Sequence, residues 1–539
     1  MNKIQNINNI PAEKFEFANR DERIFDAKFS DKPIGYFKDA FIRFRKNKAS
    51  IAASIIIIAI ILFAIIVPFF NKTETGTKLD PFYECMGPYV PGLADLGILN
   101  GSASRQPGYK TLIFDYAIGI GAQQLSSDPV NFKEAALADN EYQAVITPFG
   151  KLDPAGSKFN TTYKIKMNTY LEKGFVYREV EQAELAKIIQ WQEETGIQVI
   201  YPLIDTQTDD PESSTGAHYC MPNYINDPNY WYKMDAKGNP VDENGNAYKI
   251  DASNPDGWDF KLTPNYKTDE NGDLVYYEKV GGGTAETSQR RIRVFYYNYY
   301  QYLNGMEPSF IFGTDSQGYD LAYRLAVGIR LSLILSVVVS VINFIIGAIY
   351  GAIEGYYGGT VDIIMERCAE ILGGVPFTVV ATLFQMHLAV KVGAIPSLIF
   401  AFILTGWLGT AHLVRTQFYR FKNQEYVMAA RTLGAKDRRI IWKHIFPNSL
   451  GTIVTSSVLV IPGVIFSESM LAFLGIVNLG GAKMTSLGTL LSDASSIWTT
   501  YPHLMIFPAI IISLLMICFN LFGNGLRDAF NPSLRGVED

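Results

Sequence analysis

A nearly uninterrupted apolar run at residues 51–70 constrains this chain more than any other feature of its sequence. As a helix, about twenty residues extend roughly 30 Å, which is the thickness of the hydrocarbon layer of a bilayer. The run therefore predicts a membrane span. A basic cluster between Arg43 and Lys48 precedes it. Since basic residues favour the cytoplasmic side, we expect the N-terminus in the cytoplasm and residue 71 onward outside.

Five further apolar segments follow in the C-terminal part of the chain, and each predicts a span. They lie at residues 331–349, 375–390, 394–408, 452–466 and 504–521. Hydrophobic residues make up 48% of the sequence, and the mean hydropathy is +0.07. These values are high for a soluble protein and low for a pure bundle of spans, so we expect the chain to combine both kinds of structure.

The charge divides the chain in the same way. Residues 71–310 carry a net charge of −12, whereas the whole chain carries −6. No lysine and arginine cluster is interleaved with aromatic residues, so we attribute the positive charge to membrane topology and expect no nucleic-acid partner. We divide the chain into a cytoplasmic N-terminal segment (1–48), a first span (49–70), an extracellular insert (71–310) and a core with five spans (311–539). The core includes a basic cytoplasmic connector at 415–448.

The insert is rich in tyrosine, asparagine, aspartate and glycine, and we expect it to form a compact α+β domain. A helix is predicted at residues 178–194 and a strand at 198–204. Residues 291–302 predict a strand that runs into a helix. Hairpin turns are predicted at Lys237-Gly238, at Asn244-Gly245 and at the D-x-N-G sequences that begin at Asp242 and Asp269. The D-x-N-G sequences lack the distal glutamate of a calcium-binding EF-hand loop.

Cysteine and histidine residues are sparse in the insert. Cys85 and Cys220 are candidates for a disulfide. His218 and Cys220 form an H-x-C pair without further ligands nearby in the sequence, so we expect no metal site. The insert contains no G-x-S-x-G sequence, which disfavours a hydrolase.

Within the connector, the coupling segment (residues 425–448) is polar and basic and lies between two predicted spans. Strong helix formers and two adjacent alanines fill its first half. Gly434 stands where a helix C-cap is expected, and a second, basic helix is predicted from Asp437 until Pro447 ends it. A plain solvated loop is the alternative. The order of small residues, glycine, basic helix and H-x-x-P-N resembles the EAA loop of ABC-importer permeases, whose coupling helices dock on an ATPase subunit. Met428 stands where an acidic residue is usual.

A second motif precedes the second predicted span. Its residues are Gly313, Thr314, Asp315, Gly318, Asp320, Arg324, Gly328, Arg330 and Ser332. They resemble the GTDxxGRDxxxRLxxGxRxSL signature of the dipeptide and oligopeptide branch of these permeases, with Tyr319 in place of an arginine. In physical terms, Thr314 or Asp315 can cap a helix, while Arg324 and Arg330 can anchor it at the lipid headgroups.

Three further patterns lie in or beside the predicted spans. Glycines at four-residue intervals from Gly347 to Gly355 permit close helix contact. Three carboxylates at the same spacing, from Asp362 to Glu370, predict a solvated or salt-bridged helix face. Glu468 begins an E-S-x-L-x-F-L-G sequence that also resembles the dipeptide branch, and an ionisable residue so close to a span is a candidate for the transport pathway. The residues that resemble the family's terminal pattern are Asn520, Gly523, Gly525, Leu526, Arg527, Asp528 and Pro532.

The resemblance covers residues 34–70 and 311–539 and implies a C-type permease subunit of an oligopeptide or dipeptide ABC importer. The implied fold is an all-α polytopic membrane protein with about six transmembrane helices, of the type I importer class, here carrying a large extracellular α+β insert. No G-x-x-x-x-G-K-[ST] phosphate-binding loop occurs in the sequence, so we expect no ATPase site and no cofactor in this chain.

The resemblance also implies partners and a location. The implied partners are two ATPase subunits that bind ATP and Mg²⁺, a homologous B-type permease, an extracellular substrate-binding lipoprotein, a peptide substrate and membrane lipid. The implied location is a bacterial cell membrane, with both termini in the cytoplasm. The residues expected to couple the ATPases to the bundle are Glu425, Ala429, Ala430, Arg431, Gly434, His444 and Pro447.

Two alternatives remain open. Related permeases carry nickel or other small solutes, so the cargo class could differ. A membrane-anchored extracellular enzyme or receptor is the other alternative, although anchoring needs only one span.

Overall fold

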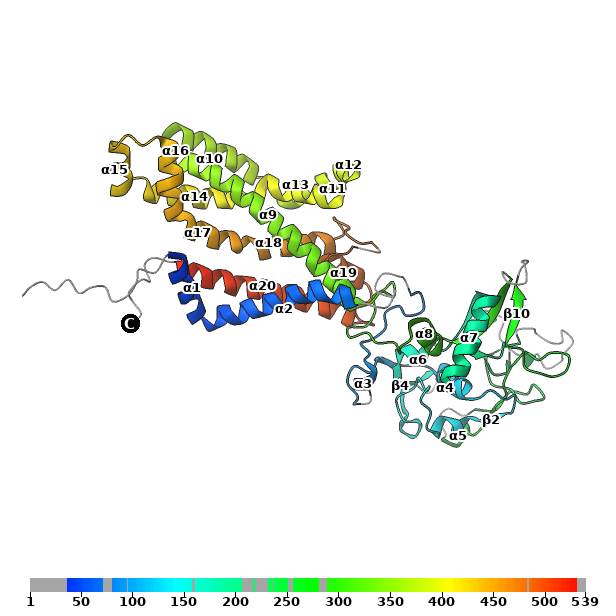
Figure 1. Ribbon diagram of the computed structural model, residues 1–539. Coiled ribbons are helices and arrows are strands. Elements are labelled where there is room, and N and C mark those ends of the chain that lie inside the picture. Colours follow the sequence, from blue (N-terminus) through cyan, green and yellow to red (C-terminus); the bar gives the residue numbers. More distant parts are fainter. Residues whose placement is uncertain are drawn as a thin grey trace, which may run out of the picture.

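The computed structural model of the chain contains a long helical bundle with an α+β insert at one end (Figure 1). The residues described are 36–70, 80–94, 96–157, 160–205, 217–218, 231–235, 237–250, 255–280, 288–481 and 484–530.

Helices form the bundle. They are α1 (Tyr36–Lys46), α2 (Lys48–Phe70), α9 (Leu321–Tyr357), α10 (Gly359–Gly373), α11 (Phe377–His387), α12 (Ala389–Val392), α13 (Ala394–Gly406), α14 (Leu408–Phe421), α15 (Glu425–Thr432), α16 (Asp437–Arg439), the π-helix η7 (Ile440–Ile445), α17 (Phe446–Val458), α18 (Val460–Phe473), α19 (Leu487–Ala494) and α20 (His503–Phe530).

Among the described residues, five helical stretches are long and apolar enough to cross a membrane. A sixth would be the pair α10 and α11, which is bent by 69°. The span predicted at 375–390 therefore corresponds only to α11 and begins after a break at Gly374 and Pro376, two residues that disfavour a continuous helix. The span predicted at 394–408 continues through α14 to Phe421.

The evenly spaced glycines of α9 pack against α14. A Cβ on Gly351 would lie 2.1 Å from the Ala411 carbonyl oxygen, and one on Gly355 would lie 2.7 Å from the Phe418 Cβ. Gly347 is enclosed by α14 in the same way. The structure thus confirms that the glycine spacing serves close helix contact.

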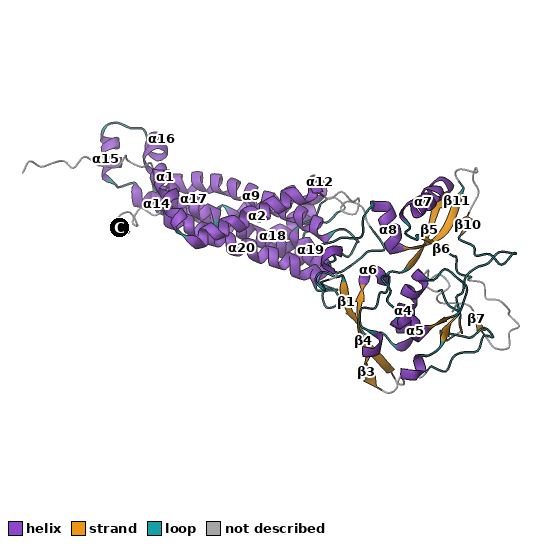
Figure 2. Cartoon of the chain, turned by 60° about the horizontal axis from the view of Figure 1, so that its bottom comes forward, coloured by secondary structure: helices purple, strands orange, loops and turns teal. Residues whose placement is uncertain are grey.

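The insert combines short helices with antiparallel strands (Figure 2). Its helices are α3 (Pro91–Ala94), α4 (Tyr109–Gln123), α5 (Phe132–Leu137), η4 (Phe149–Lys151), α6 (Thr169–Glu172), α7 (Gln182–Thr195), η6 (Pro255–Trp258) and α8 (Tyr296–Asn304). Its strands are β1 (Ser102–Arg105), β2 (Val130–Asn131), β3 (Asp153–Ser157), β4 (Asn160–Asn168), β5 (Phe175–Glu181), β6 (Ile200–Tyr201), β7 (Ala217–His218), β8 (Met234–Asp235), β9 (Lys261–Leu262), β10 (Tyr277–Val280) and β11 (Gln289–Phe295). One sheet has the order β10-β11-β5 with β6 also paired to β11, and another has the order β1-β4-β3.

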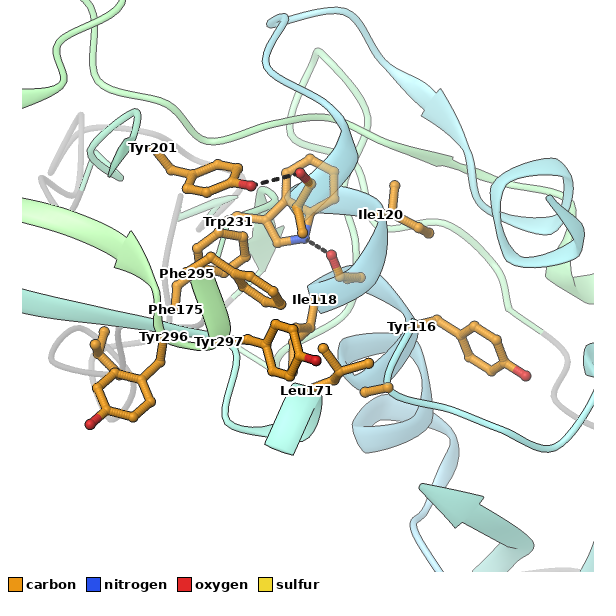
Figure 3. Close-up of a cluster of buried hydrophobic side chains, with 14 of the residues drawn as sticks. Tyr116, Ile118, Ile120, Leu171, Phe175, Tyr201, Trp231, Phe295, Tyr296 and Tyr297 are labelled. Atoms are coloured by element: carbon orange, nitrogen blue, oxygen red, sulfur yellow. Dashed lines mark hydrogen bonds between the residues drawn. The ribbon is translucent and has the colours of Figure 1, made fainter. Parts of the chain in front are cut away.

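Aromatic side chains fill the core of the insert (Figure 3). Trp231 is fully buried, and its indole N–H donates to the Ala117 carbonyl oxygen of α4 at 2.5 Å. The Tyr201 hydroxyl donates to the Ala122 carbonyl oxygen at 2.9 Å. Gly121 gives the indole room, because a Cβ there would lie 3.0 Å from the ring. Buried rings whose polar atoms find partners make the insert a compact α+β unit, as predicted.

Two predictions for the insert were wrong in their bounds. The helix predicted at 178–194 begins at Gln182, because the preceding residues belong to β5, which pairs along its whole length with β11. The strand predicted at 198–204 has only the two paired residues of β6. The predicted passage from strand to helix at 291–302 is confirmed, since β11 runs directly into α8.

Four turns share one geometry. In each, an aspartate Oδ1 accepts hydrogen bonds of 2.8–2.9 Å from the N–H groups two and four residues later, and a glycine three residues later has a φ of +75° to +87°. The turns begin at Asp235, Asp242, Asp269 and Asp315. Glycine tolerates this left-handed backbone, and the aspartate side chain replaces missing backbone partners. The D-x-N-G sequences are thus tight turns, as predicted.

Candidate functional site

The coupling segment lies at the end of the bundle farthest from the insert (Figure 1). Helix α15 ends at Thr432, and Gly434 follows with a φ of +79°. The N–H of Gly434 bonds to the Arg431 oxygen and the N–H of Ala435 bonds to the Ala430 oxygen, both at 3.0 Å. These two bonds form a Schellman motif, which confirms the predicted C-cap.

The inner side of the coupling segment is fixed to the bundle. Val427 and Ile440 are fully buried against side chains of α9 and α14. At the end of α9, the Tyr356 hydroxyl donates to Asp437 Oδ1 at 2.6 Å and accepts from Arg431 at 3.4 Å. One tyrosine therefore joins the two halves of the segment. Tyr356 could not be recognised from the sequence, because no local pattern connects it with a residue 81 positions later.

The outer side of the segment is exposed. Glu425, Ala429, Arg431, Gly434 and Pro447 are exposed, and Ala430 and His444 are half-buried. The Leu433 side chain is 88% exposed. A basic hollow of about 500 Å³ beside it is lined by Lys436, Arg438, Arg439, Trp442 and Lys443. Such a mixture of apolar and basic groups suits a partner surface that is apolar and acidic.

The expectation that Pro447 ends the second helix was wrong. Residues from Asp437 to Phe473 form one helical stretch, in which the turn before Pro447 is the π-helix η7. The Phe446 N–H bonds to the Ile441 oxygen five residues back. A wider turn at this point accommodates a residue that has no N–H and whose ring would clash with an α-helical carbonyl.

The pre-span motif holds together the two ends of the insert. Thr314 Oγ1 donates to the Tyr83 oxygen at 2.5 Å and accepts from the Met86 N–H at 2.8 Å. A Cβ on Gly313 would lie 2.2 Å from the Met86 oxygen, and one on Gly318 would lie 2.0 Å from the Asp80 oxygen. The chain thus enters and leaves the insert along two neighbouring segments. Their backbones can approach this closely only because both positions are glycine.

The expected roles of other motif residues need correction. Asp320, rather than Thr314 or Asp315, caps α9 by accepting from the Ala322 N–H at 2.8 Å. Arg324 is not a headgroup anchor. It is 3% exposed, pairs with the buried Asp315 at 3.2 Å and donates to the Gly481 carbonyl oxygen at 2.6 Å, so its charge is satisfied within the protein.

Arg330 likewise points into the protein. It donates to the Ala64 carbonyl oxygen of α2 at 2.8 Å. The contact ties the first span to the second.

Glu468 is fully buried inside the bundle rather than on an open channel surface. Its Oε2 accepts from the Ser332 hydroxyl of α9 at 2.9 Å. Helix α19 lies close to it. A Cβ on Gly488 would come within 2.5 Å of the Ser469 Cα. Glu468 therefore lies at a tight junction of α9, α18 and α19.

A charged cluster near the connector was only partly foreseen. Arg415 pairs with Asp362 through Nε at 2.6 Å and Nη2 at 3.0 Å. It also lies 3.3 Å from Glu354 and 3.7 Å from Glu366. The salt-bridged face predicted for Asp362 and Glu366 is confirmed, whereas Glu370 pairs with the exposed Arg367.

The predicted disulfide stays a prediction, because Cys220 lies outside the described residues. Cys85 is half-buried, and burial raises the pKa of its thiol to about 11.

Comparison with known proteins decides the family. The model of binding-protein-dependent transport system inner membrane components matches residues 343–536, and that of the N-terminal TM domain of oligopeptide transport permease C matches residues 35–83. The oligopeptide transport system permease protein OppC of Bacillus subtilis is 43% identical over 225 residues, which cover 42% of this chain and 72% of that protein. The chain belongs to this family of transport permeases.

Other relatives agree with this assignment. The dipeptide transport system permease protein DppC of Bacillus subtilis is 43% identical over 42% of this chain and 69% of its own length. The OppC protein of Haemophilus influenzae is 44% identical over 43% of this chain and 72% of its own length. Among solved structures, the inward-facing MetNI methionine ABC transporter matches with a TM-score of 0.32 and 17% identity, over 38% of this chain and 94% of that chain. That distant likeness adds no argument.

The permease is the C-type, non-catalytic membrane component, and the ATPase resides in a partner subunit. The alternative of a membrane-anchored enzyme or receptor is therefore not supported. The two family matches leave residues 84–342, which include most of the insert, between them.

Proposed function

We propose that this permease is the membrane-spanning subunit of an ATP-driven importer of oligopeptides, and that the coupling segment passes the nucleotide cycle of two ATPases to the bundle. The observation that carries the proposal is the two-sided construction of the segment. Its inner side is fixed to α9 and α14 through Val427 and Tyr356, while its outer side is exposed. The cargo class rests on the relatives, which are named for oligopeptide and dipeptide transport.

The proposed topology places the coupling segment in the cytoplasm and the insert outside the cell. The two lie at opposite ends of the bundle, and the basic helix α1 and the C-terminal end of α20 lie at the end of the coupling segment (Figure 1). Basic residues at that end and an acidic insert at the other agree with the cytoplasmic preference of positive charge. A B-type permease would complete the transport path.

The structure suggests how movement at the coupling segment reaches the opposite end. One helical stretch of 37 residues runs from Asp437 to Phe473, a length of roughly 55 Å. It begins in the coupling segment and carries Glu468, which contacts Ser332 of α9. When the ATPases push the segment, this stretch transmits the displacement to the junction with α19, and the bundle alternates between inward and outward access.

The test is the substitution Gly434→Glu in the reconstituted transporter. Gly434 is exposed, and no atom lies within 4 Å of a Cβ built on it, so the substitution causes no clash. Its φ of +79° strains any side chain, by about 1–2 kcal/mol, and the control below carries the same strain. We expect substrate-stimulated ATP turnover to fall by about tenfold or more. The new carboxylate would have to lose its hydrating water when the ATPase docks, which weakens docking.

Gly196→Glu is the matched control. Gly196 is also an exposed helix C-cap, with a φ of +73° and open surroundings, but it lies in the insert. Turnover and uptake that stay unchanged in Gly434→Glu would contradict the proposed docking role.

For the insert, we propose that it orients the substrate-binding lipoprotein over the mouth of the bundle. It lies at the proposed outer end, and its two ends are fixed to the second span by the pre-span motif.

A further inference from the structure

The insert contains a cavity of about 450 Å³ that the transport mechanism leaves without a role. Helices α3, α6 and α8 and the segment 141–146 contribute to its wall. Tyr89, which lines it, forms an antiparallel bridge with Phe310, three residues before the pre-span motif. The cavity therefore lies at the base of the insert, next to the bundle.

The lining is aromatic and acidic. Tyr89, Tyr142, Tyr297, Glu141, Glu307 and the amide of Gln143 are among the residues that line it. No lysine or arginine is present among the described residues of the lining. Glu141 and Glu307 are exposed at the rim of the cavity, and no described cation of the lining pairs with them.

Both carboxylates act on the same part of the cavity. Burial and then the neighbouring Glu141 raise the pKa of the Tyr142 phenol, and Glu307 raises it further. The Tyr297 hydroxyl lies 3.1 Å from that of Tyr89. Tyrosine rings and carboxylates thus surround one volume.

The Gln143 side chain closes one side of the cavity. Both polar atoms of its amide are buried. The amide lies against α4 and not toward the open space, because a Cβ on Gly119 would lie 3.0 Å from the Gln143 Oε1. The tyrosine rings and the carboxylates are therefore the groups of the wall that a bound cation would meet.

We propose that this cavity binds the ammonium group of a short peptide, with tyrosine rings and the two carboxylates around the charge. Ammonium groups are attracted to aromatic faces and form strong hydrogen bonds with carboxylates. A neutral sugar would also find rings and amides here, but it would leave both carboxylates without a counter-charge. The proposal rests on the proposed peptide cargo and adds a first binding site ahead of the bundle.

The test uses the full chain in lipid nanodiscs, without ATPases, and titrates it with trilysine. We expect saturable binding that weakens about tenfold or more in the double variant Glu141→Gln/Glu307→Gln, since two charge-assisted contacts are lost. Ile146→Lys, at an exposed position in the lining, should also weaken binding by placing an ammonium group in the cavity. The matched control is Glu134→Gln/Glu193→Gln, which removes two exposed carboxylates outside the cavity and should bind trilysine normally.

Three results would overturn the proposal: trilysine does not bind, trilysine binds the double variant as well as the parent, or maltotriose competes for the cavity while trilysine does not. Because no nucleotide or ATPase is present, failure here is separate from failure of the coupling role, which the turnover of Gly434→Glu tests.

Discussion

Single glycines set how closely α9 approaches α14. At Gly351, even one added carbon atom would lie 2.1 Å from a backbone oxygen, and a backbone atom yields less easily than a flexible side chain. Gly409, also in this helix pair, has no atom within 4 Å of a Cβ. Alanine at Gly351 therefore tests the close contact between the helices, whereas alanine at Gly409 tests only the preference of a helix for alanine over glycine.

We predict that Gly351→Ala destabilises the permease by about 1–3 kcal/mol, as expected for overpacking. Gly409→Ala should be neutral or stabilising by up to about 1 kcal/mol, because alanine is the better helix former. Thermal unfolding of both variants in the same detergent measures the difference. Equal midpoints would show that α9 and α14 do not pack as described.

A buried carboxyl in the insert predicts a pH dependence. Asp115 of α4 is 6% exposed, and burial, followed by the nearby Glu172, raises its pKa to about 8 although Arg105 opposes the shift. In the unfolded chain its pKa is about 4. The folded insert therefore holds a proton on Asp115 that the unfolded chain releases, so the contribution of this group to stability is fully present below about pH 4 and is lost as the pH rises through about 8.

Asp115→Asn should remove this decline. We expect the variant to exceed the parent in stability by at least about 1 kcal/mol at pH 9 and to match it at pH 4, since one pKa unit corresponds to about 1.4 kcal/mol. Tryptophan fluorescence during thermal unfolding reports on the insert through Trp231 and Trp258 in its core, and the signal of Trp407, Trp442 and Trp498 outside the insert is common to parent and variant. The exposed Asp128→Asn serves as the control. A stability gain that is the same at both pH values would contradict the argument.

At the scale of elements, the coupling segment is held by a few contacts to the end of α9. The two helices α15 and α16 are short, so neither would be stable alone. Their positions depend on the buried side chains of Val427 and Ile440 and on the hydroxyl of Tyr356. Loss of that hydroxyl should loosen the segment without removing apolar packing.

We predict that Tyr356→Phe increases hydrogen exchange at residues 431–439 by severalfold and lowers substrate-stimulated ATP turnover, while the melting midpoint changes little. A part-buried hydrogen bond contributes about 1 kcal/mol. Tyr357→Phe is the matched control, because Tyr357 is 55% exposed. Unchanged exchange in Tyr356→Phe would mean that the hydroxyl does not hold the two halves together.

At the scale of the whole molecule, the insert and the bundle meet along a narrow junction. Segment 80–89 lies beside residues 310–318, and Tyr89 and Phe310 exchange two backbone hydrogen bonds of 2.8 and 2.7 Å. The insert can therefore be removed after Tyr89 with a linker of only a few residues.

We predict that a chain lacking residues 90–309 folds and assembles, with a melting midpoint close to that of the parent bundle. A chain lacking 80–309 should melt several degrees lower, because Thr314 loses its partners Tyr83 and Met86. The first variant also tests lipoprotein docking in a pull-down, where unaltered lipoprotein binding would contradict the proposed role of the insert.

The sequence alone determined the features that depend on neighbouring residues. Five of the six apolar runs of spanning length, the glycine spacing of α9, the C-cap at Gly434 and the aspartate–glycine turns arise from local chemistry and are present in the structure. The family motifs identified the coupling segment for the same reason, since their residues are adjacent in the chain.

Only the tertiary structure decided the partners of the polar groups. Arg324 pairs with Asp315 inside the fold rather than meeting lipid headgroups, and Tyr356 holds a segment about 80 residues away. Strand β5 continues to Glu181, through residues where local propensity favoured a helix. In each case the stabilising contact is made with groups that are distant in sequence. A buried charge or a strand edge needs a partner, and the folding of the chain decides which partner lies within reach.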